Sequence, residues 1–549
     1  MAMPSTDTTA VASGPKKTLG VTGVTINAMA LIAPGAFLWI TFQLQAAQTG
    51  PDGSTTAFDM WQGIVFALIL AFLTAISYSQ MATIYPEAGY GSSYYFAEKT
   101  FMDKSEHRHY RWARLAKLVT GWAAHLFYWV YPGVMVTFFA IVVSYVAGLF
   151  GATDGSGNPG LPVYVNVVIA VVFAVVVGMI AVRGISGSTL TSLIINIIQL
   201  TTLVFFSVLA IIYRVTNPDH ADFVNFAGKD AAGKVTSTQI GHPDVGSILL
   251  PHSFGSVLFQ STIAILILVG FESCTALGAD AKDPKRSVPR GVLLSLIIQG
   301  LFAYLIEYFA ANLALSDKLT NTDATGAPVA GISAAAASQA PIGDLMRLFG
   351  DSLLGGIGFG LDVTMAVTVL LAILGTTLAC INTGVRVSYA MAKDKEMPEI
   401  MGLMHGRFAT PSAGVWILVA VSAIIGGIGA INTVIQTGIG IASNLGTFIL
   451  YALICVFTLV AFAGRKEHNV FLHIVIPVVG LLANILMIGT IFYLAFVAGG
   501  NSSTEGFIAI GFAAVWGLLS IVYILLNNRN SGRGLLHPEG FKETVSSGV

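Results

Sequence analysis

Long apolar stretches alternate with short polar segments along most of this chain. An apolar helix needs roughly 20 residues to cross the ~30 Å hydrocarbon core of a bilayer. Twelve stretches approach or exceed that length, at residues 20–48, 58–85, 118–150, 162–182, 188–213, 254–280, 291–315, 356–392, 412–431, 437–463, 470–498 and 505–527. This pattern predicts an all-α integral membrane protein with twelve transmembrane helices.

Lysine and arginine residues lie mostly in every second connection between these stretches. Cytoplasmic loops of membrane proteins carry an excess of Lys and Arg. The connections and helix ends on the same side as the two termini hold all but five of the 27 Lys and Arg residues, and those five are Arg214, Lys229, Lys234, Lys318 and Arg347. We therefore expect a disordered N-terminal tail (1–17) and a C-terminal tail (528–549) in the cytoplasm, and extracellular loops at 214–253 and 316–355.

Composition supports a membrane protein. Hydrophobic residues make up 55% of the chain and charged residues only 10%, with a mean hydropathy of +0.78, whereas soluble domains carry about 25% charged residues. The net charge is −1 and no basic block suggests a nucleic-acid partner. The three cysteines lie inside apolar stretches and indicate no disulfide framework. No removable signal peptide is visible, so we expect the first apolar stretch to remain as a membrane helix.

A single carboxylate interrupts the sixth stretch. Glu272 lies ten residues before Lys282, which is about 15 Å of helix and therefore near the bilayer midplane. An ionisable residue there is costly and is a functional-site hypothesis by default. One interpretation is a carboxyl that takes up and releases a proton as substrate binds and leaves. The other is a carboxyl hydrogen-bonded to backbone at a helix break, and the two are compatible.

The first stretch contains Pro34 followed by Gly35. Proline cannot donate to the carbonyl four residues earlier, that of Ala30, and it kinks or breaks a helix. Membrane-depth backbone stays unpaired only where it is buried in protein or lines a cavity. Interrupted segments in corresponding halves of a chain point to the binding site of an inverted-repeat transporter, so breaks at stretches one and six favour that class.

Other ionisable residues have weaker claims. Glu307, in the outer part of the seventh stretch, is either a second proton-coupling residue or an interfacial carboxylate. Asp362 begins the eighth stretch and is interpreted as a carboxylate at a helix N-terminus. Asp280 could pair with Arg183 or Arg386 as an inner gate, or could be a solvated helix end.

His125 lies in an aromatic-rich segment. It could bind substrate or relay a proton, but a histidine in such a segment is more often only hydrogen-bonded within a helix bundle.

Four segments together resemble the amino acid–polyamine–organocation (APC) transporter superfamily. GFESCTALGADAKDPKRSVPRG (270–291) is similar to its sixth-span signature. The other three are YPEAGYGSSYYF (85–96), VRGISGSTLTSLIINIIQL (182–200) and NTGVRVSYAMAKDKEMPEIMGLMHGRFATPS (382–412), and the resemblance covers roughly residues 18–465.

The resemblance implies a LeuT-like fold of two inverted five-span repeats, at 18–213 and 254–463, followed by two further helices within 464–527. It also implies that substrate binds between the broken first and sixth spans. The corresponding candidates here are Ala30, Ile32, Ala33, Pro34, Gly35, Ala36, Ile265, Leu266, Leu268, Gly270 and Glu272.

Three positions depart from the family pattern. Ala33-Pro34-Gly35 replaces a Gly-Ser-Gly-like triplet whose amides grip the substrate carboxylate, so that role must shift to neighbours such as Gly35 and Ala36. Leu266 stands where arginine/agmatine antiporters carry an aromatic residue that stacks on a cationic substrate. Gln199 stands near the place of a fifth-span lysine that replaces a sodium ion in some proton-coupled members.

These observations predict a secondary transporter for an amino acid, most simply a neutral one, working by alternating access with proton coupling or exchange. A polyamine or cationic-amine transporter of the same superfamily, or a potassium or chloride carrier, are the alternatives. No ATP-binding loop, haem spacing or metal cluster suggests a cofactor or an enzyme. The expected partners are a small-molecule substrate and the lipid bilayer of the plasma membrane (in a bacterium, the cell inner membrane), and a homo-oligomer is left open.

Overall fold

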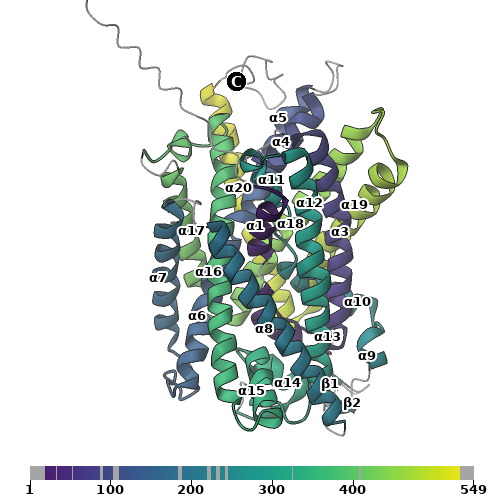
Figure 1. The fold of residues 1–549 in the computed structure, drawn as a ribbon, viewed down its shortest axis with the longest axis vertical. Coiled ribbons are helices and arrows are strands. Elements are labelled where there is room, and N and C mark those ends of the chain that lie inside the picture. Colours follow the sequence, from purple (N-terminus) through teal and green to yellow (C-terminus); the bar gives the residue numbers. More distant parts are fainter. Residues whose placement is uncertain are drawn as a thin grey trace, which may run out of the picture.

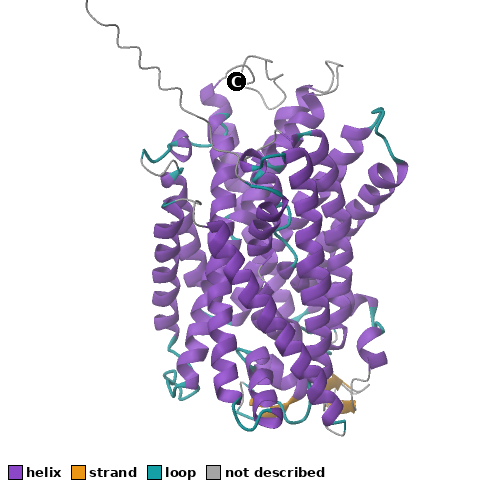
Figure 2. Ribbon diagram, in the orientation of Figure 1, coloured by secondary structure: helices purple, strands orange, loops and turns teal. Residues whose placement is uncertain are grey.

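Helices that run roughly along the long axis make up most of the computed structural model (Figure 1). It describes residues 19–531 apart from 33, 52, 87–90, 103–109, 184–187, 219–223, 230–234, 241–244, 324–325 and 407–409. Figure 2 shows that the described strands lie at one end of the bundle. The ends of α4, α5 and α20 lie at the opposite end, which we call the basic end because Arg114, Lys117 and Lys395 gather there.

Ten helical segments of the described chain are long and apolar enough to cross a membrane. Several of them contain more than one element. The elements are α3 (Met60–Ile84) preceded by η1 (Ala57–Asp59), α5 (Tyr110–Tyr128) with α6 (Tyr131–Leu149), α7 (Val163–Val182), α8 (Ser188–Thr216), α12 (Pro284–Leu296) with the π-helix η6 (Ile297–Tyr304) and α13 (Leu305–Ala314), α16 (Gly358–Lys393), α17 (Ser412–Gly429), α18 (Thr433–Phe462), η8 (Phe471–Val475) with α19 (Ile476–Tyr493) and η9 (Leu494–Ala498), and α20 (Gly500–Ser531).

The first and sixth apolar stretches are each divided into shorter pieces. The first consists of α1 (Val21–Ile32) and α2 (Pro34–Ala47). The sixth consists of α10 (Phe254–Ala264), η4 (Ile265–Ile267), α11 (Ser273–Ala276) and η5 (Gly278–Asp280). The sixth stretch is therefore interrupted where Glu272 lies, as expected, and the described helices of the first stretch end and begin on either side of residue 33.

The connections carry the remaining elements. At the end opposite the basic end lie two antiparallel strand pairs, β1 (Val224–Lys229) with β2 (Val235–Ile240) and β3 (Thr320–Thr322) with β4 (Pro328–Ala330), together with α9 (Val245–Leu249), α14 (Gly331–Ala337) and α15 (Pro341–Leu353). The other short helices are α4 (Ser93–Met102) and η7 (Glu399–Gly402).

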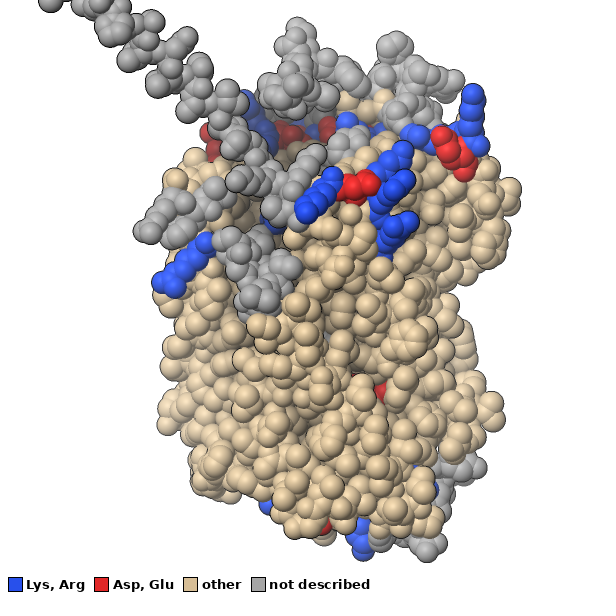
Figure 3. All heavy atoms as spheres, in the orientation of Figure 1, with Lys and Arg blue, Asp and Glu red and all other residues tan. Residues whose placement is uncertain are grey.

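The side of the bundle is apolar over most of its height. Figure 3 shows a broad band with almost no charged side chains between a charge-rich end and a sparsely charged one. Large apolar side chains such as Val204, Leu482 and Leu518 are exposed on the outer helices, and the apolar part of α20 is only 11% buried. Such a surface is stable facing lipid and not water, so this is a multi-pass membrane protein.

Candidate functional site

The end of α1 is held by side chains that replace missing helix hydrogen bonds. Pro34 has no N–H to give to the carbonyl of Ala30, and Thr376 Oγ1 donates to that oxygen instead, at 3.1 Å. The Tyr304 hydroxyl donates to the carbonyl of Ile32 at 2.7 Å. Side chains of α16 and η6 therefore supply hydrogen-bond donors to the carbonyls at the end of α1.

Gly270 brings the two breaks into contact. Its φ is +120°, a conformation that favours glycine. A Cβ at this position would come within 2.9 Å of Leu31 Cγ and 3.0 Å of the Ile32 backbone nitrogen. The backbone of the sixth stretch therefore packs directly on the end of α1, and a larger residue would force the two apart.

Glu272 lies immediately after this contact and is fully buried. Its Oε2 accepts from the Gly270 N–H at 3.0 Å and from the Tyr451 hydroxyl at 2.9 Å. Its Oε1 accepts from the Tyr128 hydroxyl at 3.1 Å. The carboxyl thus ties the break to α5 and α18 through three donors.

The other described candidates around the breaks are apolar. Ile265, Leu266 and Leu268 are buried, as are Ala30 and Ile32. The carbonyl of Leu266 accepts from the Tyr131 hydroxyl at 3.2 Å. Ala33 lies outside the described residues, and for Pro34, Gly35 and Ala36 the structure describes the helical backbone of α2 but not the side chains.

Asp280, at the end of the sixth stretch, forms an ion pair with Arg386 of α16. Arg386 donates to Asp280 Oδ2 and to the Ala276 carbonyl, each at 2.9 Å. The backbone of Leu19 bonds to Asp280 at 3.0 Å and to Lys282 at 2.8 Å. Of the two expected partners, Arg386 pairs with Asp280, whereas Arg183 is exposed at the end of α7.

A protein-family model described as "Amino acid permease" matches residues 17–519. The chain belongs to the amino acid permease family. Its relatives include the branched-chain amino acid permease BcaP of Lactococcus lactis, 24% identical over 66% of this chain and 68% of that one. The methylthioribose transporter of Bacillus subtilis is 22% identical over 41% and 42% of the two chains. The low-affinity putrescine importer PlaP of Escherichia coli is 22% identical over 85% and 87%. These are transporters, and the amino acid permease described here is a transporter and not an enzyme.

Glu307 of the permease contrasts with Glu272. It is fully buried in α13, yet neither of its carboxyl oxygens has a hydrogen-bond partner among the described residues. Its helical neighbours Tyr304 and Tyr308 reach the first stretch, through the Ile32 carbonyl and through a ring contact with Phe42 at 5.6 Å. A buried carboxylate without donors costs several kcal/mol, so a neutral, protonated carboxyl suits this place.

Sequence reasoning missed an interior link between α1 and α8. Asn196 Nδ2 donates to the Ile26 carbonyl at 3.1 Å, and Gln299 Nε2 lies 3.5 Å from Asn196 Oδ1. Gln199, expected to replace a family lysine, is buried one turn away in α8. Asn196, a second amide side chain one turn before Gln199, was the feature of the sequence that could have indicated this link.

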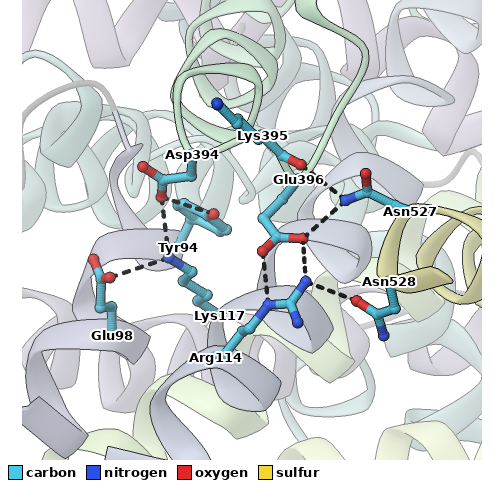
Figure 4. Close-up of polar contacts among 9 residues, drawn as sticks. All are labelled: Tyr94, Glu98, Arg114, Lys117, Asp394, Lys395, Glu396, Asn527 and Asn528. Carbon is cyan, nitrogen blue, oxygen red and sulfur yellow. Dashed lines mark hydrogen bonds and ion pairs between the residues drawn. The ribbon is translucent and has the colours of Figure 1, made fainter. Parts of the chain in front are cut away.

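A buried ion network at the basic end was also missed (Figure 4). Arg114 and Glu396, each 1% exposed, form a bidentate ion pair with N···O distances of 2.8 and 3.0 Å. Lys117 contacts Glu98 at 3.1 Å and Asp394 at 3.2 Å. Further hydrogen bonds come from Tyr94, which donates to Asp394, and from Asn527 and Asn528 of α20. The three-residue spacing of Arg114 and Lys117 on one helix face could have indicated it.

His125 has a structural role in this arrangement. Its Nδ1 lies 2.6 Å from the Gly121 carbonyl and its Nε2 2.8 Å from Ser388 Oγ. With the proton on Nδ1, Nε2 can accept from the Ser388 hydroxyl, whose other acceptor is the Gly384 carbonyl at 2.9 Å. The more ordinary of the two sequence interpretations therefore accounts for the geometry.

The three cysteines are buried in the bundle. The sulfurs of Cys274 and Cys380 lie 3.9 Å from the carbonyls of Val24 and Tyr128, and that of Cys455 lies 3.9 Å from Ser77 Oγ. They act as small packing residues.

Proposed function

We propose that this permease carries a neutral amino acid with an apolar side chain, by alternating access, between the two helix breaks. The observation that carries the proposal is that the described residues around the two breaks are mostly apolar. Ile32, Leu266 and Leu268 are apolar, and the carboxyl of Glu272 is already occupied by three donors. An apolar side chain would lose its hydration there without leaving a polar group unpaired.

The backbone at the breaks suits the two charged ends of an amino acid. The N-terminal end of α2 presents free amides and the positive end of a helix dipole, which favour a carboxylate. Pro34 has no amide, so Gly35 and Ala36 would supply the donors. The C-terminal end of α1 carries the negative end of its dipole and favours an ammonium.

A polyamine or cationic amine is the second candidate, and the likeness to PlaP favours it. An ammonium would need an acceptor, and Glu272 is the carboxyl next to the contact between the breaks. It would have to give up a bond from Tyr128 or Tyr451, a cost that a neutral side chain avoids. The likeness to BcaP, a branched-chain amino acid permease, supports the neutral substrate.

The proposal includes a topology of twelve spans with both termini in the cytoplasm of a plasma-membrane protein. The two broken stretches would be spans one and six of a LeuT-like 5+5 inverted repeat. The basic end would face the cytoplasm, so Asp280 and Arg386 would be the inner gate. The described candidate residues are buried, and substrate would therefore enter only after one end opens.

We assign different roles to the two buried carboxyls Glu272 and Glu307. Glu272 would mainly hold the shape of the break, because its donors persist whatever the substrate. Glu307 would carry the coupled proton, because it has no donor to stabilise its ionised form. The transporter would be a proton symporter if Glu307 releases its proton on the same side as the substrate, and an exchanger if it releases the proton on the opposite side.

Uptake by the purified full-length permease in proteoliposomes tests the substrate. Labelled leucine, valine and putrescine would be offered with and without an acidic exterior. We expect leucine and valine uptake that accelerates with the pH gradient, and no putrescine uptake. Putrescine uptake with no leucine uptake would overturn the first candidate in favour of the second. A lack of thermal stabilisation by any amino acid would contradict both the site and the substrate class.

A further inference from the structure

Two aspartates share one tyrosine hydroxyl at the end opposite the basic end. The Tyr145 hydroxyl, at the end of α6, lies 3.0 Å from Asp344 Oδ1 of α15 and 2.8 Å from Asp362 Oδ2 of α16. Asp362 is fully buried. Neither the substrate path nor the proposed proton carrier uses this group, which we call the outer carboxyl pair.

Hydrogen counting shows that this geometry needs one extra proton. A phenol has one hydrogen and donates it to one acceptor at a time. If both carboxyls were ionised, one of them would face the phenol oxygen with no hydrogen between. If one carboxyl is protonated, it donates to the phenol oxygen while the phenol donates to the other carboxylate, so each of the two contacts contains one hydrogen.

The surroundings provide little other compensation. The Ser338 hydroxyl bonds to Asp344 Oδ2, but Asp362 Oδ1 has no partner among the described residues. It faces Gly343, where an added Cβ would come within 2.5 Å of it. Burial raises the pKa of the Asp344 carboxyl, against the opposing effects of Ser338, Tyr145 and Arg347.

The charged groups acting on the pair, within the described chain, are the two aspartates and Arg347. The guanidinium carbon of Arg347 lies 5.9 Å from the centre of the Phe359 ring. Within the described residues, Arg347 forms no ion pair with either aspartate. The neighbouring residues are Trp39 of α2, Tyr213 of α8 and Ser338, which directly follows α14. Of these three only Tyr213 can titrate. Its hydroxyl is turned to Ser316, at 3.2 Å.

The pair joins a cover to the bundle. Helix α15 lies so close to α2 that a Cβ on Gly343 would come within 2.4 Å of the Trp39 ring, and Trp39 packs edge-on against Tyr145 at 5.5 Å. Asp344 therefore links α15 to α6 directly and to α16 through the Tyr145 hydroxyl, in addition to the bond from the Gly358 N–H to Asp351 Oδ1.

We infer that Asp344 and Asp362 bind one proton between them on Tyr145, and that this proton holds α15 closed over the end of the bundle. Loss of the proton leaves two negative charges around one hydroxyl, and α15 loosens. Because closure takes up one proton, the equilibrium between closed and open α15 shifts by up to about tenfold per pH unit towards closed as pH falls. In the proposed orientation this cover faces outward, although the proton site itself does not depend on substrate or on Glu307.

Hydrogen exchange of residues 341–353 tests the inference on the full chain in lipid nanodiscs without substrate. Rates would be corrected for the intrinsic pH dependence of amide exchange, between about pH 5 and about pH 8. We expect protection of α15 to fall as pH rises in the wild type. Asp362→Asn should flatten this dependence with α15 protected throughout, because an amide donates to Tyr145 as the protonated carboxyl does.

Three further variants make the test decisive. Asp344→Asn should also flatten the dependence, so the inference stands on it if Asp362→Asn does not fold. Tyr145→Phe should lower protection at the acidic end. Asp351→Asn is the matched control, because it removes a charge from the same helix while its side chain can still accept from the Gly358 N–H, and its dependence should equal that of the wild type. A flat wild-type profile, or unchanged slopes in both Asp→Asn variants at the pair, would overturn the inference.

Discussion

The buried and half-buried carboxyls at the two ends of this permease have opposite kinds of partner. At the basic end, Glu396 is paired with Arg114, Asp280 with Arg386, and Asp394 with Lys117. At the other end Asp344 and Asp362 meet a tyrosine, and Glu307 meets no partner in the described chain. Carboxylates with cations stay ionised, whereas carboxyls without them are stabilised by protons. We therefore expect the end opposite the basic end to respond to moderate changes of pH.

The largest expected effect comes from removing an ion pair at the basic end. Glu396→Ala removes the carboxylate that pairs with the buried Arg114, which should destabilise the protein by about 3–5 kcal/mol. Unfolding in denaturant, followed by circular dichroism, would measure the loss. The double variant Arg114→Met/Glu396→Leu removes both charges and should recover most of it. Equal losses in the single and double variants would show that packing, and not charge pairing, holds this end.

The midplane offers a smaller and cleaner contrast between two tyrosines. Tyr451→Phe removes a donor from buried Glu272 and should cost about 1–3 kcal/mol. Tyr308→Phe is the matched control, because the Tyr308 hydroxyl has no partner among the described residues, and it should be neutral or stabilising. Thermal unfolding of both variants measures the difference. If both lose equally, the donors to Glu272 are not what stabilises the break.

The third contrast concerns transport and leaves stability almost unchanged. Glu307→Gln should abolish the acceleration of uptake by an acidic exterior while the permease folds normally. Glu272→Gln should keep that acceleration, because a glutamine can accept from Gly270 and Tyr451 and donate to Tyr128. Uptake in proteoliposomes at two exterior pH values measures both. The opposite result would move the proton carrier to Glu272.

The smallest expected effect is the pH dependence of overall stability. A group whose pKa is raised by folding, as burial does for Asp344, contributes stability at low pH that is lost as pH rises through the folded-state pKa. Asp344→Asn should therefore flatten the dependence of the melting midpoint on pH towards about pH 8, the upper end of the range used for hydrogen exchange. Asp351→Asn should leave that slope as it is. A wild-type midpoint that rises with pH there would contradict the sign.

The sequence was sufficient to predict the breaks and their approximate content. Pro34 removes a specific donor, and Glu272 is conspicuous in an apolar stretch, so local chemistry indicated both positions. Their partners could not be predicted in the same way. Tyr451 and Thr376 lie far along the chain from the groups they satisfy, and only the fold brings them together.

The outer carboxyl pair shows the same limit. Asp362 was interpreted as a residue at a helix N-terminus, but the first turn of α16 has no acidic residue, and Asp362 lies just beyond that turn, where it accepts from the Tyr145 hydroxyl. What position alone could not indicate is Tyr145, which belongs to another helix and brings the two aspartates to one hydroxyl. The choice between Arg183 and Arg386 for Asp280 was equally a question of helix packing.

The burial of Cys274, Cys380 and Cys455 has a practical consequence for watching this molecule move. Water-borne maleimide reagents should find no reactive native thiol on the folded permease, because thiol reactivity requires access and an ionised sulfur. A cysteine introduced on the exposed side of α15 could then carry a fluorophore or spin label without prior removal of the natural ones. Opening and closing of the cover could thus be followed in a protein whose interior is unaltered.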